Sequence, residues 1–343
     1  MASNKFNLQS GKFNKSVFSK IHSSRVHHLY RCVNVRNILI ALCLFLIVYI
    51  VKAWRNRLSF GQYTYVFQRE TILEKRSSRF HNITIAQSGP LRMLRFDMHG
   101  VEGIVHIHKP NILLFDYMRL QLLCLLWYST PERVLILGLG AGILPRVLHH
   151  LSPSSTIDVV DIDTEVIDLA RKYFHFNENQ MIRTFVEDGR RFIERQTSNQ
   201  YDVIIIDANT VNGHIPHDLR TVECLAEYIR ILKRTGLLLA NYPHEQESRY
   251  RETYSRALFK YIYRGKLPYN YVLIGLNQDT TVYNLQELQM RARNLQAVKS
   301  IPEMSWLEEV KYIHDEQQDH WNRSATIFTD KSYENFIGDS EQN

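Results

Sequence analysis

The first 69 residues contain no acidic side chain, because the first acid is Glu70. They contain eleven Lys or Arg residues. The whole chain has 42 basic and 35 acidic residues, so removing these eleven leaves 31 basic against 35 acidic residues, a net −4 for residues 70–343. The formal net charge of +7 therefore originates in the N-terminal arm. A main part with net negative charge has no general attraction for phosphate backbones, so we expect no nucleic-acid partner.

Cysteine is scarce, and the four cysteines form no CxxC pair. Their wide spacing supports neither a disulfide framework nor a zinc site. Two histidine pairs, His106 with His108 and His214 with His217, each lack a clear third ligand, so we interpret them as surface or loop histidines and predict no metal. The cysteines are Cys32, Cys43, Cys124 and Cys224.

No apolar run reaches the about 20 residues that usually cross a bilayer, and the run at residues 38–51 has 14. Arg36, Lys52 and Trp54 flank this run, and snorkelling of the charged ends lengthens its usable span. We therefore predict a single-pass membrane protein with a transmembrane anchor that contacts the lipid bilayer at residues 37–54, after a basic tail at 1–36. A cleaved signal or targeting peptide and a buried core helix are the alternatives, and the orientation is left open.

Residues 63–108 contain short β-like runs separated by turn residues, such as HNITIA, LRMLRF and GIVHIH. This pattern predicts a small antiparallel β-sheet within residues 55–112. An apolar helix is expected to follow at residues 113–128. Its stripe at residues 120–127 is interpreted as core, with a homodimer contact as the alternative.

Strand-like and helical runs then alternate, as in α/β proteins. Several strand-like runs are continuously apolar (VLIL, DVIII, LLLA), as expected for a parallel sheet covered by helices on both faces. We predict strands at 134–137, 157–161, 184–187, 203–207 and 237–241, and helices at 143–151, 165–174, 190–195, 219–232 and 283–298. The predicted domains are a Rossmann-like cofactor-binding domain at 113–280, a helical extension at 281–330 and a polar tail at 331–343.

A glycine-rich turn lies between the first of these strands and its helix, in the sequence VLILGLGAGI. Glycines allow the backbone to approach a ligand closely, and the following helix presents its N-terminal amides. A simple tight turn is the alternative for this motif alone. We predict that Gly138, Leu139, Gly140 and Gly142 bind a cofactor.

Asp161 ends the second strand, 23 residues after Gly138, where an acid can hydrogen-bond both hydroxyls of a ribose. Its neighbour Ile162 is included in the predicted cofactor site. Asp163 is expected to be the N-cap of the next helix instead.

Two further acids follow later strands of the same array. Asp188 and Gly189 follow the third strand, where an acid can accept a hydrogen bond from an adenine amino group. Asp207 ends the fourth strand. Because ligands bind at the carboxyl ends of parallel strands, these turns are expected to converge on one crevice. A nicotinamide dinucleotide is less favoured, because Ile143 stands where its GxGxxG fingerprint needs Gly or Ala.

The motifs VLILGLGAG, VVDIDTEVIDLARKYF, VEDGRRFI, YDVIIIDA and ECLAEYIRILKRTGLLLANY resemble the spermidine synthase family, within the class I methyltransferase fold. The resemblance covers about residues 78–276. It implies a small N-terminal β-sheet followed by a Rossmann-like domain. It also implies S-adenosylmethionine, or its decarboxylated form, as the cofactor.

Three positions depart from the family pattern. The family has two acids three residues apart after the fourth strand, and the second helps to deprotonate the amine nucleophile; here Asp207 is followed by Thr210, whose hydroxyl cannot replace a carboxylate as a general base. Ala141 stands where the family's glycine loop usually carries an acid. A Tyr-His-Glu element that helps to hold the amine is replaced by residues 114–120, LFDYMRL.

We predict a transferase that moves a methyl or aminopropyl group from this cofactor to an unidentified small-molecule acceptor. Asp207 is the predicted catalytic residue, and His214 is a further candidate acid or base. A polyamine acceptor needs several carboxylates nearby, for which Asp116, Asp207 and Asp218 are candidates. The alternative is a binding or scaffold protein that keeps the fold and has lost catalysis.

Overall fold

The computed structural model describes residues 59–60, 63–64, 69–97, 100–210, 214–244, 247–257, 259–315 and 324–332. The chain divides into two compact units, one formed by residues 1–59 with 64–66 and the other by residues 60–63 with 67–343. Strands β1 (Ser59–Phe60) and β2 (Tyr63–Thr64) pair with each other. All elements from β3 onward belong to the second unit, which is described below.

The predicted basic tail at 1–36 and anchor at 37–54 lie outside the described residues. Within the part of the chain that the structure does describe, no helix combines the length and the apolar character needed to cross a bilayer. The predicted single-pass membrane localisation is therefore corrected, and bilayer anchoring forms no part of the function proposed below. The run of 14 apolar residues on which it rested is itself shorter than a usual span of about 20.

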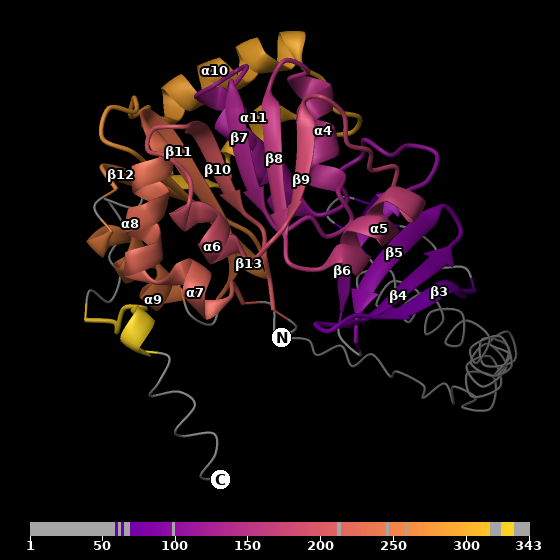
Figure 1. Cartoon of the computed structure of the whole chain (residues 1–343). Helices are drawn as coiled ribbons and strands as arrows, with labels where there is room; N and C mark the ends of the chain where they lie inside the picture. The colour runs from indigo at the N-terminus through magenta and orange to yellow at the C-terminus, as the bar shows by residue number, and fades with distance from the viewer. Residues whose placement is uncertain are drawn as a thin grey trace, which may run out of the picture. The chain divides into compact units, whose positions relative to one another are not determined.

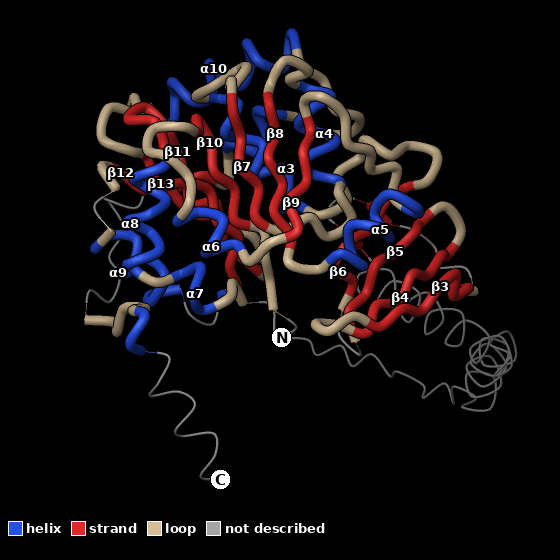
Figure 2. Tube along the Cα trace, in the orientation of Figure 1, coloured by secondary structure: helices blue, strands red, loops and turns tan. Residues whose placement is uncertain are grey.

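An eight-stranded sheet in the order β14-β12-β13-β11-β10-β7-β8-β9 forms the centre of the second unit (Figures 1 and 2). Its parallel strands are β7 (Arg133–Leu137), β8 (Thr156–Asp161), β9 (Ile182–Val186), β10 (Tyr201–Ile206) and β11 (Leu232–Pro243). The antiparallel strands are β12 (Tyr261–Lys266), β13 (Asn270–Leu276) and β14 (Ile313–Asp315).

Helices cover both faces of this sheet, because alternate apolar side chains of each strand point to opposite sides. On β7, Val134 and Ile136 join one buried cluster, whereas Leu135 and Leu137 join the other. The first cluster includes side chains of α3 (Asp116–Gln121), α4 (Ile143–Leu151), α5 (Thr164–Tyr173), α10 (Leu285–Val298) and α11 (Trp306–Val310). The second includes α6 (Gly189–Glu194), α7 (His217–Arg220), α8 (Val222–Ile231) and α9 (Glu247–Arg256). The predicted mostly parallel, Rossmann-like sheet is confirmed.

A four-stranded antiparallel sheet precedes the central one, in the order β3-β4-β5-β6 (Figure 1). Its strands are β3 (Thr71–Ser77), β4 (Asn82–Ser88), β5 (Leu91–Phe96) and β6 (Val101–His106). The predicted small sheet is thus confirmed. It contacts the glycine-rich loop, because a Cβ added to Gly103 on β6 would lie 2.5 Å from the Cβ of Ala141.

Two predicted helices differ from the structure. The helix expected at 113–128 is α3 followed by a 3₁₀ helix, η1 (Leu122–Leu126), whose five side chains are all buried. A 3₁₀ turn distributes side chains in three directions, so each finds a place in the core. The helix expected at 219–232 is divided into α7 and α8, because Thr221 is extended and its hydroxyl accepts a hydrogen bond from the Cys224 amide at 3.2 Å.

The sheet also continues beyond the predicted strands. β12 and β13 extend it past β11, and β14 adds residues from the region expected to be a helical extension. A three-residue strand carries no periodic pattern that a sequence reading could detect. The domain boundaries given above remain predictions.

Candidate functional site

The strand order reverses between β7 and β10, and this is where ligands bind in open α/β sheets. The loops after these two strands are in contact. The Asp207 amide donates to the Leu137 carbonyl at 2.8 Å. A Cβ added to Gly138 would lie 2.6 Å from the carbonyl oxygen of Asp207. The glycine-rich loop and Asp207 therefore share one edge of the sheet, as the sequence predicts.

Three glycines of this loop have left-handed backbone conformations, with φ of 91° at Gly138, 52° at Gly140 and 68° at Gly142. Their surroundings differ. A Cβ on Gly142 would lie 2.7 Å from the ring of Phe176, whereas a Cβ on Gly140 would meet no atom within 4 Å. Gly138 and Gly142 are thus required by packing, and Gly140 borders open space where a ligand can approach the backbone.

Asp161 is bonded to the glycine-rich loop. Its Oδ2 accepts from the Leu139 amide at 2.8 Å and its Oδ1 accepts from the Asp163 amide at 2.9 Å. Burial raises the pKa of Asp161, and these amide hydrogen bonds act against the rise. Asp161 therefore lies at the end of β8, where the sequence predicts a carboxylate that hydrogen-bonds a ribose. Asp163 is the N-cap of α5, as predicted, and accepts from the Glu165 amide at 3.0 Å.

Two large apolar side chains are exposed at the same edge. Ile162, which follows β8, is 43% exposed, and Val186, which ends β9, is 56% exposed. Exposed apolar side chains on neighbouring strand ends provide a surface for a flat aromatic ring. Ile162 is a predicted site residue, whereas the sequence assigns no role to Val186, because an apolar residue at a strand end carries no signal in sequence.

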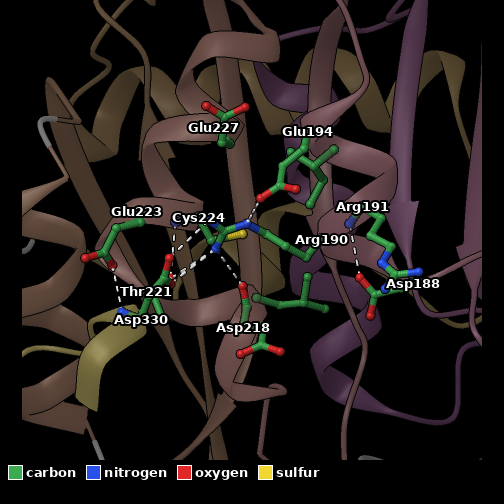
Figure 3. Close-up of polar contacts among 12 residues, drawn as sticks. Asp188, Arg190, Arg191, Glu194, Asp218, Thr221, Glu223, Cys224, Glu227 and Asp330 are labelled. Atoms are coloured by element: carbon green, nitrogen blue, oxygen red, sulfur yellow. Dashed lines mark hydrogen bonds and ion pairs between the residues drawn. The ribbon is translucent and has the colours of Figure 1, made fainter. Parts of the chain in front are cut away.

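Asp188 and Gly189 begin α6. The Asp188 carboxylate is the N-cap of this helix and accepts from the Arg191 amide at 3.0 Å (Figure 3). The Glu187 amide donates to the Asp161 carbonyl at 3.1 Å, which brings the loop after β9 beside the end of β8. Gly189 contacts α7, because its added Cβ would lie 3.2 Å from Leu219. The structure thus brings the predicted residues of the three loops to one edge and makes Asp188 the N-cap of α6.

Asp207 has the most perturbed environment of these acids. Burial raises the pKa of its carboxyl group from 3.8 to about 7, and the charge of Glu102 adds to the rise, whereas Gln121, Asn241 and Tyr117 act against it. Its Oδ1 is buried without a hydrogen-bond partner among the described residues. A carboxyl group that titrates near neutral pH is suited to proton transfer.

The neighbours of Asp207 come from separate parts of the chain: Glu102 on β6, Tyr117 and Gln121 on α3, and Asn241 on β11. Gln121 is fully buried, and its side-chain amide lies close enough to Asp207 to lower the pKa of that carboxyl group. Burial and the charge of Asp207 raise the pKa of Tyr117. In the sequence, Gln121 is a polar residue interrupting an apolar stripe, and this was the available signal for it.

The other candidate acids are placed less favourably. Asp116 is ion-paired with Arg119, which also pairs with Glu309 at 3.0 Å. Asp218 is exposed on α7. Neither acid is among the groups with the largest effects on the pKa of Asp207.

The candidate histidines have structural contacts. The Thr210 amide donates to the His214 carbonyl at 2.8 Å, and a role for the His214 side chain remains a prediction. His106 Nδ1 accepts from the Lys109 amide at 3.1 Å. Among the residues the structure describes, no group of three or more His, Cys, Asp or Glu side chains is arranged to bind a metal ion.

Comparison with known proteins identifies the family. The family model described as the spermine/spermidine synthase domain matches residues 119–274. The polyamine aminopropyltransferase of Vibrio vulnificus (strain CMCP6) is 31% identical over 280 residues, which cover 77% of this chain and 90% of that protein. This chain belongs to the spermine/spermidine synthase family.

Solved structures of this family share its fold. A probable spermidine synthase from Corynebacterium glutamicum ATCC 13032 superposes with a TM-score of 0.58 at 22% identity, covering 68% of this chain and 89% of that one. A spermidine synthase in complex with the transition-state analogue AdoDATO has a TM-score of 0.56 at 18% identity, with coverages of 74% and 93%.

Ala141 and Thr210 are the two loop positions at which the sequence is expected to depart from the family pattern. Ala141 is buried, and Gly103 on β6 lies against it, so the small side chain is part of the contact between the two sheets. Because residue 210 is a threonine, the loop after β10 carries Asp207 without the second acid that the family pattern implies. Glu102, next to Gly103 on β6, is an acid whose charge raises the pKa of Asp207.

Proposed function

We propose that this chain is an aminopropyltransferase-type enzyme that binds decarboxylated S-adenosylmethionine and transfers its aminopropyl group to an amine. The observation that carries the proposal is the Asp207 carboxyl group, which has a pKa near 7 and a buried Oδ1 without a hydrogen-bond partner among the described residues, at the strand-order reversal. Family membership supports the reaction class.

The donor's adenosine is assigned to the glycine-rich loop and the ends of β8 and β9. Open space over Gly140 admits the nucleoside against backbone amides. Asp161 bonds the ribose hydroxyls, and the adenine ring lies between Ile162 and Val186, with Asp188 near its amino group. A family structure at low identity was solved with a transition-state analogue, AdoDATO, whose name indicates an adenosyl group.

The reacting end is assigned to Asp207. The acceptor arrives as an ammonium ion, and the Asp207 carboxylate takes one proton to leave a nucleophilic amine. The amine nitrogen then forms a bond to the carbon beside the sulfonium, and the carbon–sulfur bond breaks to leave a neutral thioether nucleoside. In this in-line displacement, positioning of the two substrates contributes most of the rate.

Negative charge at the acceptor end comes from two elements of the chain. Asp207 follows β10 and Glu102 lies on β6, and their charges interact. We infer that Glu102 supplies the second carboxylate that Thr210 does not provide. A pair of carboxylates favours a cationic amine over a neutral acceptor.

The test is product analysis with the purified full chain. Decarboxylated S-adenosylmethionine or S-adenosylmethionine is incubated with putrescine, and spermidine, methylated amines and the thioether nucleoside are quantified by mass spectrometry. We expect spermidine with the decarboxylated donor. Methylated amine with S-adenosylmethionine instead would indicate the methyltransferase alternative.

A binding or scaffold role is the second candidate, favoured by Thr210 at the position of the family's base. It requires donor binding without turnover. Calorimetry with each donor separates the two cases, because the enzyme both binds and converts its donor. Absence of binding of either donor at millimolar concentration contradicts both candidates.

A further inference from the structure

A surface pocket of about 420 Å³ is lined by residues of α4 and of the loops after β6 and α5. None of these lining residues belongs to the site proposed for the two substrates. The volume falls in the range of about 300–1,000 Å³ that is usual for small-molecule pockets. None of the described lining side chains is acidic, and four are basic or protonatable: Arg146, His149, His150 and His175.

The sequence of α4 places three of these side chains together. Arg146 is three residues before His149 and four before His150, so the three lie on one face of the helix. The apolar residues of α4 join the buried core instead: Ile143, Leu144, Val147, Leu148 and Leu151. The basic face is therefore left to form one wall of the pocket.

Arg146 is partly buried, and among the described residues its guanidinium group donates hydrogen bonds only to neutral acceptors. Its Nη1 donates to Asn111 Oδ1 at 2.7 Å, and its Nη2 donates to the Pro110 carbonyl at 2.6 Å. Three of its five N–H groups therefore have no partner in the described part of the chain. Burial lowers the pKa of Arg146 from 12.5 to about 10. An anion in the pocket would stabilise this charge.

His175 lies near two such cations. Burial lowers the pKa of His175, and the charges of Arg146 and Arg92 lower it further. Arg92 also donates to neutral acceptors, Gln87 Oε1 at 2.8 Å and the Tyr173 carbonyl at 2.9 Å. Because like charges disfavour the protonated form of His175, a bound anion would relieve their repulsion and favour that form.

His149 is held in its neutral form by Asn179. The Oδ1 of Asn179 accepts from the Met181 and Ile182 amides at 2.7 and 2.9 Å, so its Nδ2 is the atom that faces His149. This amide nitrogen donates to His149 Nε2 at 3.2 Å, and a ring nitrogen that accepts carries no proton. His149 is therefore a neutral wall of the pocket, and the permanent charge is that of Arg146.

We propose that this pocket binds the phosphate group of a small organic molecule, with Arg146, His150 and His175 as its donors. A phosphate group presents three acceptor oxygens, which suits donors that come from two separate elements, whereas a carboxylate presents two. A phosphate ion fills only part of about 420 Å³, and the remaining space admits the organic part of the ligand. The inference does not depend on the proposed transferase function.

Calorimetry on the purified full chain tests the proposal with glycerol 3-phosphate, inorganic phosphate and acetate as probes. We expect glycerol 3-phosphate to bind with a dissociation constant below about 1 mM, and acetate to bind at least about tenfold more weakly. Inorganic phosphate that binds as tightly as glycerol 3-phosphate would support the phosphate site and assign it to the free ion. Acetate that binds as tightly as the phosphate compounds, or no binding of either phosphate compound at about 10 mM, would overturn the proposal.

Two substitutions locate the bound phosphate. Arg146→Gln is expected to weaken glycerol 3-phosphate binding at least about tenfold, and His175→Asn about threefold or more. Asn tolerates the left-handed backbone at position 175, where φ is 58°, so this variant should fold even if Arg146→Gln does not. The matched controls are Arg234→Gln, from an exposed ion pair with Asp279, and His314→Asn, an exposed histidine on β14. Neither control should change the affinity.

Nuclear magnetic resonance gives a readout that a structural role would not move. The imidazole C–H signals of His150 and His175 should shift when glycerol 3-phosphate is added, and those of His314 should not. If His175→Asn binds as tightly as the parent and these signals do not shift, the proposal is refuted. The basic face would then serve only the carboxyl end of α4, where positive charge is favourable.

Discussion

The backbone amide of Leu139 donates a 2.8 Å hydrogen bond to Oδ2 of Asp161. One carboxylate therefore orders the glycine-rich loop and is also the group proposed to hydrogen-bond the donor's ribose. Because loop geometry and ligand contact depend on the same side chain, its removal should affect binding more than the loss of a single ligand hydrogen bond would.

Asp161→Ala is expected to weaken binding of decarboxylated S-adenosylmethionine by about 100-fold, measured by calorimetry. The estimate combines lost hydrogen bonds to the ribose, about 1.5–3 kcal/mol for a charged acceptor, with a less ordered loop. Asp168→Ala on the exposed side of α5 serves as the control, because it removes an acid that pairs only at the surface with Arg171. Equal affinity in Asp161→Ala and the parent would refute the ribose assignment.

Asp207→Asn is expected to lower kcat for aminopropyl transfer by at least about 100-fold, because the amide cannot accept the ammonium proton. Donor affinity should change by less than about threefold, since the nucleoside is bound elsewhere. Quenched-flow measurement of a single turnover separates the chemical step from binding. A variant that retains most of the parent rate would show that another group is the base.

The same substitution is expected to stabilise the protein at pH 8. The folded pKa of Asp207 is raised from 3.8 to about 7, so the stability contribution of this group is complete below pH 3.8 and is lost as the pH rises to about 7. Asn carries no charge and avoids this loss. Urea unfolding should show Asp207→Asn to be more stable than the parent by about 2 kcal/mol at pH 8, with a smaller difference at pH 4. An identical difference at both pH values would contradict the raised pKa.

The pH dependence of kcat/KM should report the same group. The carboxylate is the active form, so kcat/KM for putrescine is expected to increase about tenfold per pH unit below pH 7 and to level off above it. The charge of Glu102 contributes to the raised pKa, so Glu102→Gln should move the midpoint to lower pH. A midpoint that does not move would remove Glu102 from the acceptor end.

Two glycines of one loop should respond differently to alanine. Gly138→Ala places a Cβ 2.6 Å from the Asp207 carbonyl and is expected to destabilise the protein by about 3 kcal/mol. Gly140→Ala meets no atom and should cost only about 1 kcal/mol for its left-handed conformation, yet it should weaken donor binding because its methyl group occupies the ligand's side of the loop. Chemical unfolding and calorimetry on both variants check the contrast.

The sequence predicts β7, β8, β9, β10 and the helix α4 to within two residues at each end, because apolar runs and a glycine turn determine them locally. The fifth parallel strand, β11, extends well beyond the predicted residues 237–241. The sequence also predicts that residues 138–142, 161, 188 and 207 meet at one edge, since the ends of parallel strands share an edge. The strand β14 and the division between α7 and α8 depend on tertiary contacts, such as the Thr221 cap. No local pattern carries this information.

The neighbours of Asp207 were the least predictable part of the site. Glu102, Gln121 and Asn241 are distant in sequence and lie on a strand of the small sheet, a helix and a strand of the large sheet. Each is unremarkable in its own segment. Their common relation is to one buried carboxyl group, which only the three-dimensional structure specifies.

The contact between Gly103 and Ala141 has an evolutionary consequence. The two positions share one small volume, so a bulkier residue at either requires the two sheets to separate. We expect related proteins that carry a larger residue in the glycine loop to accommodate it with a compensating change on the facing strand. Substitutions at these two sites are therefore expected to be inherited as a pair.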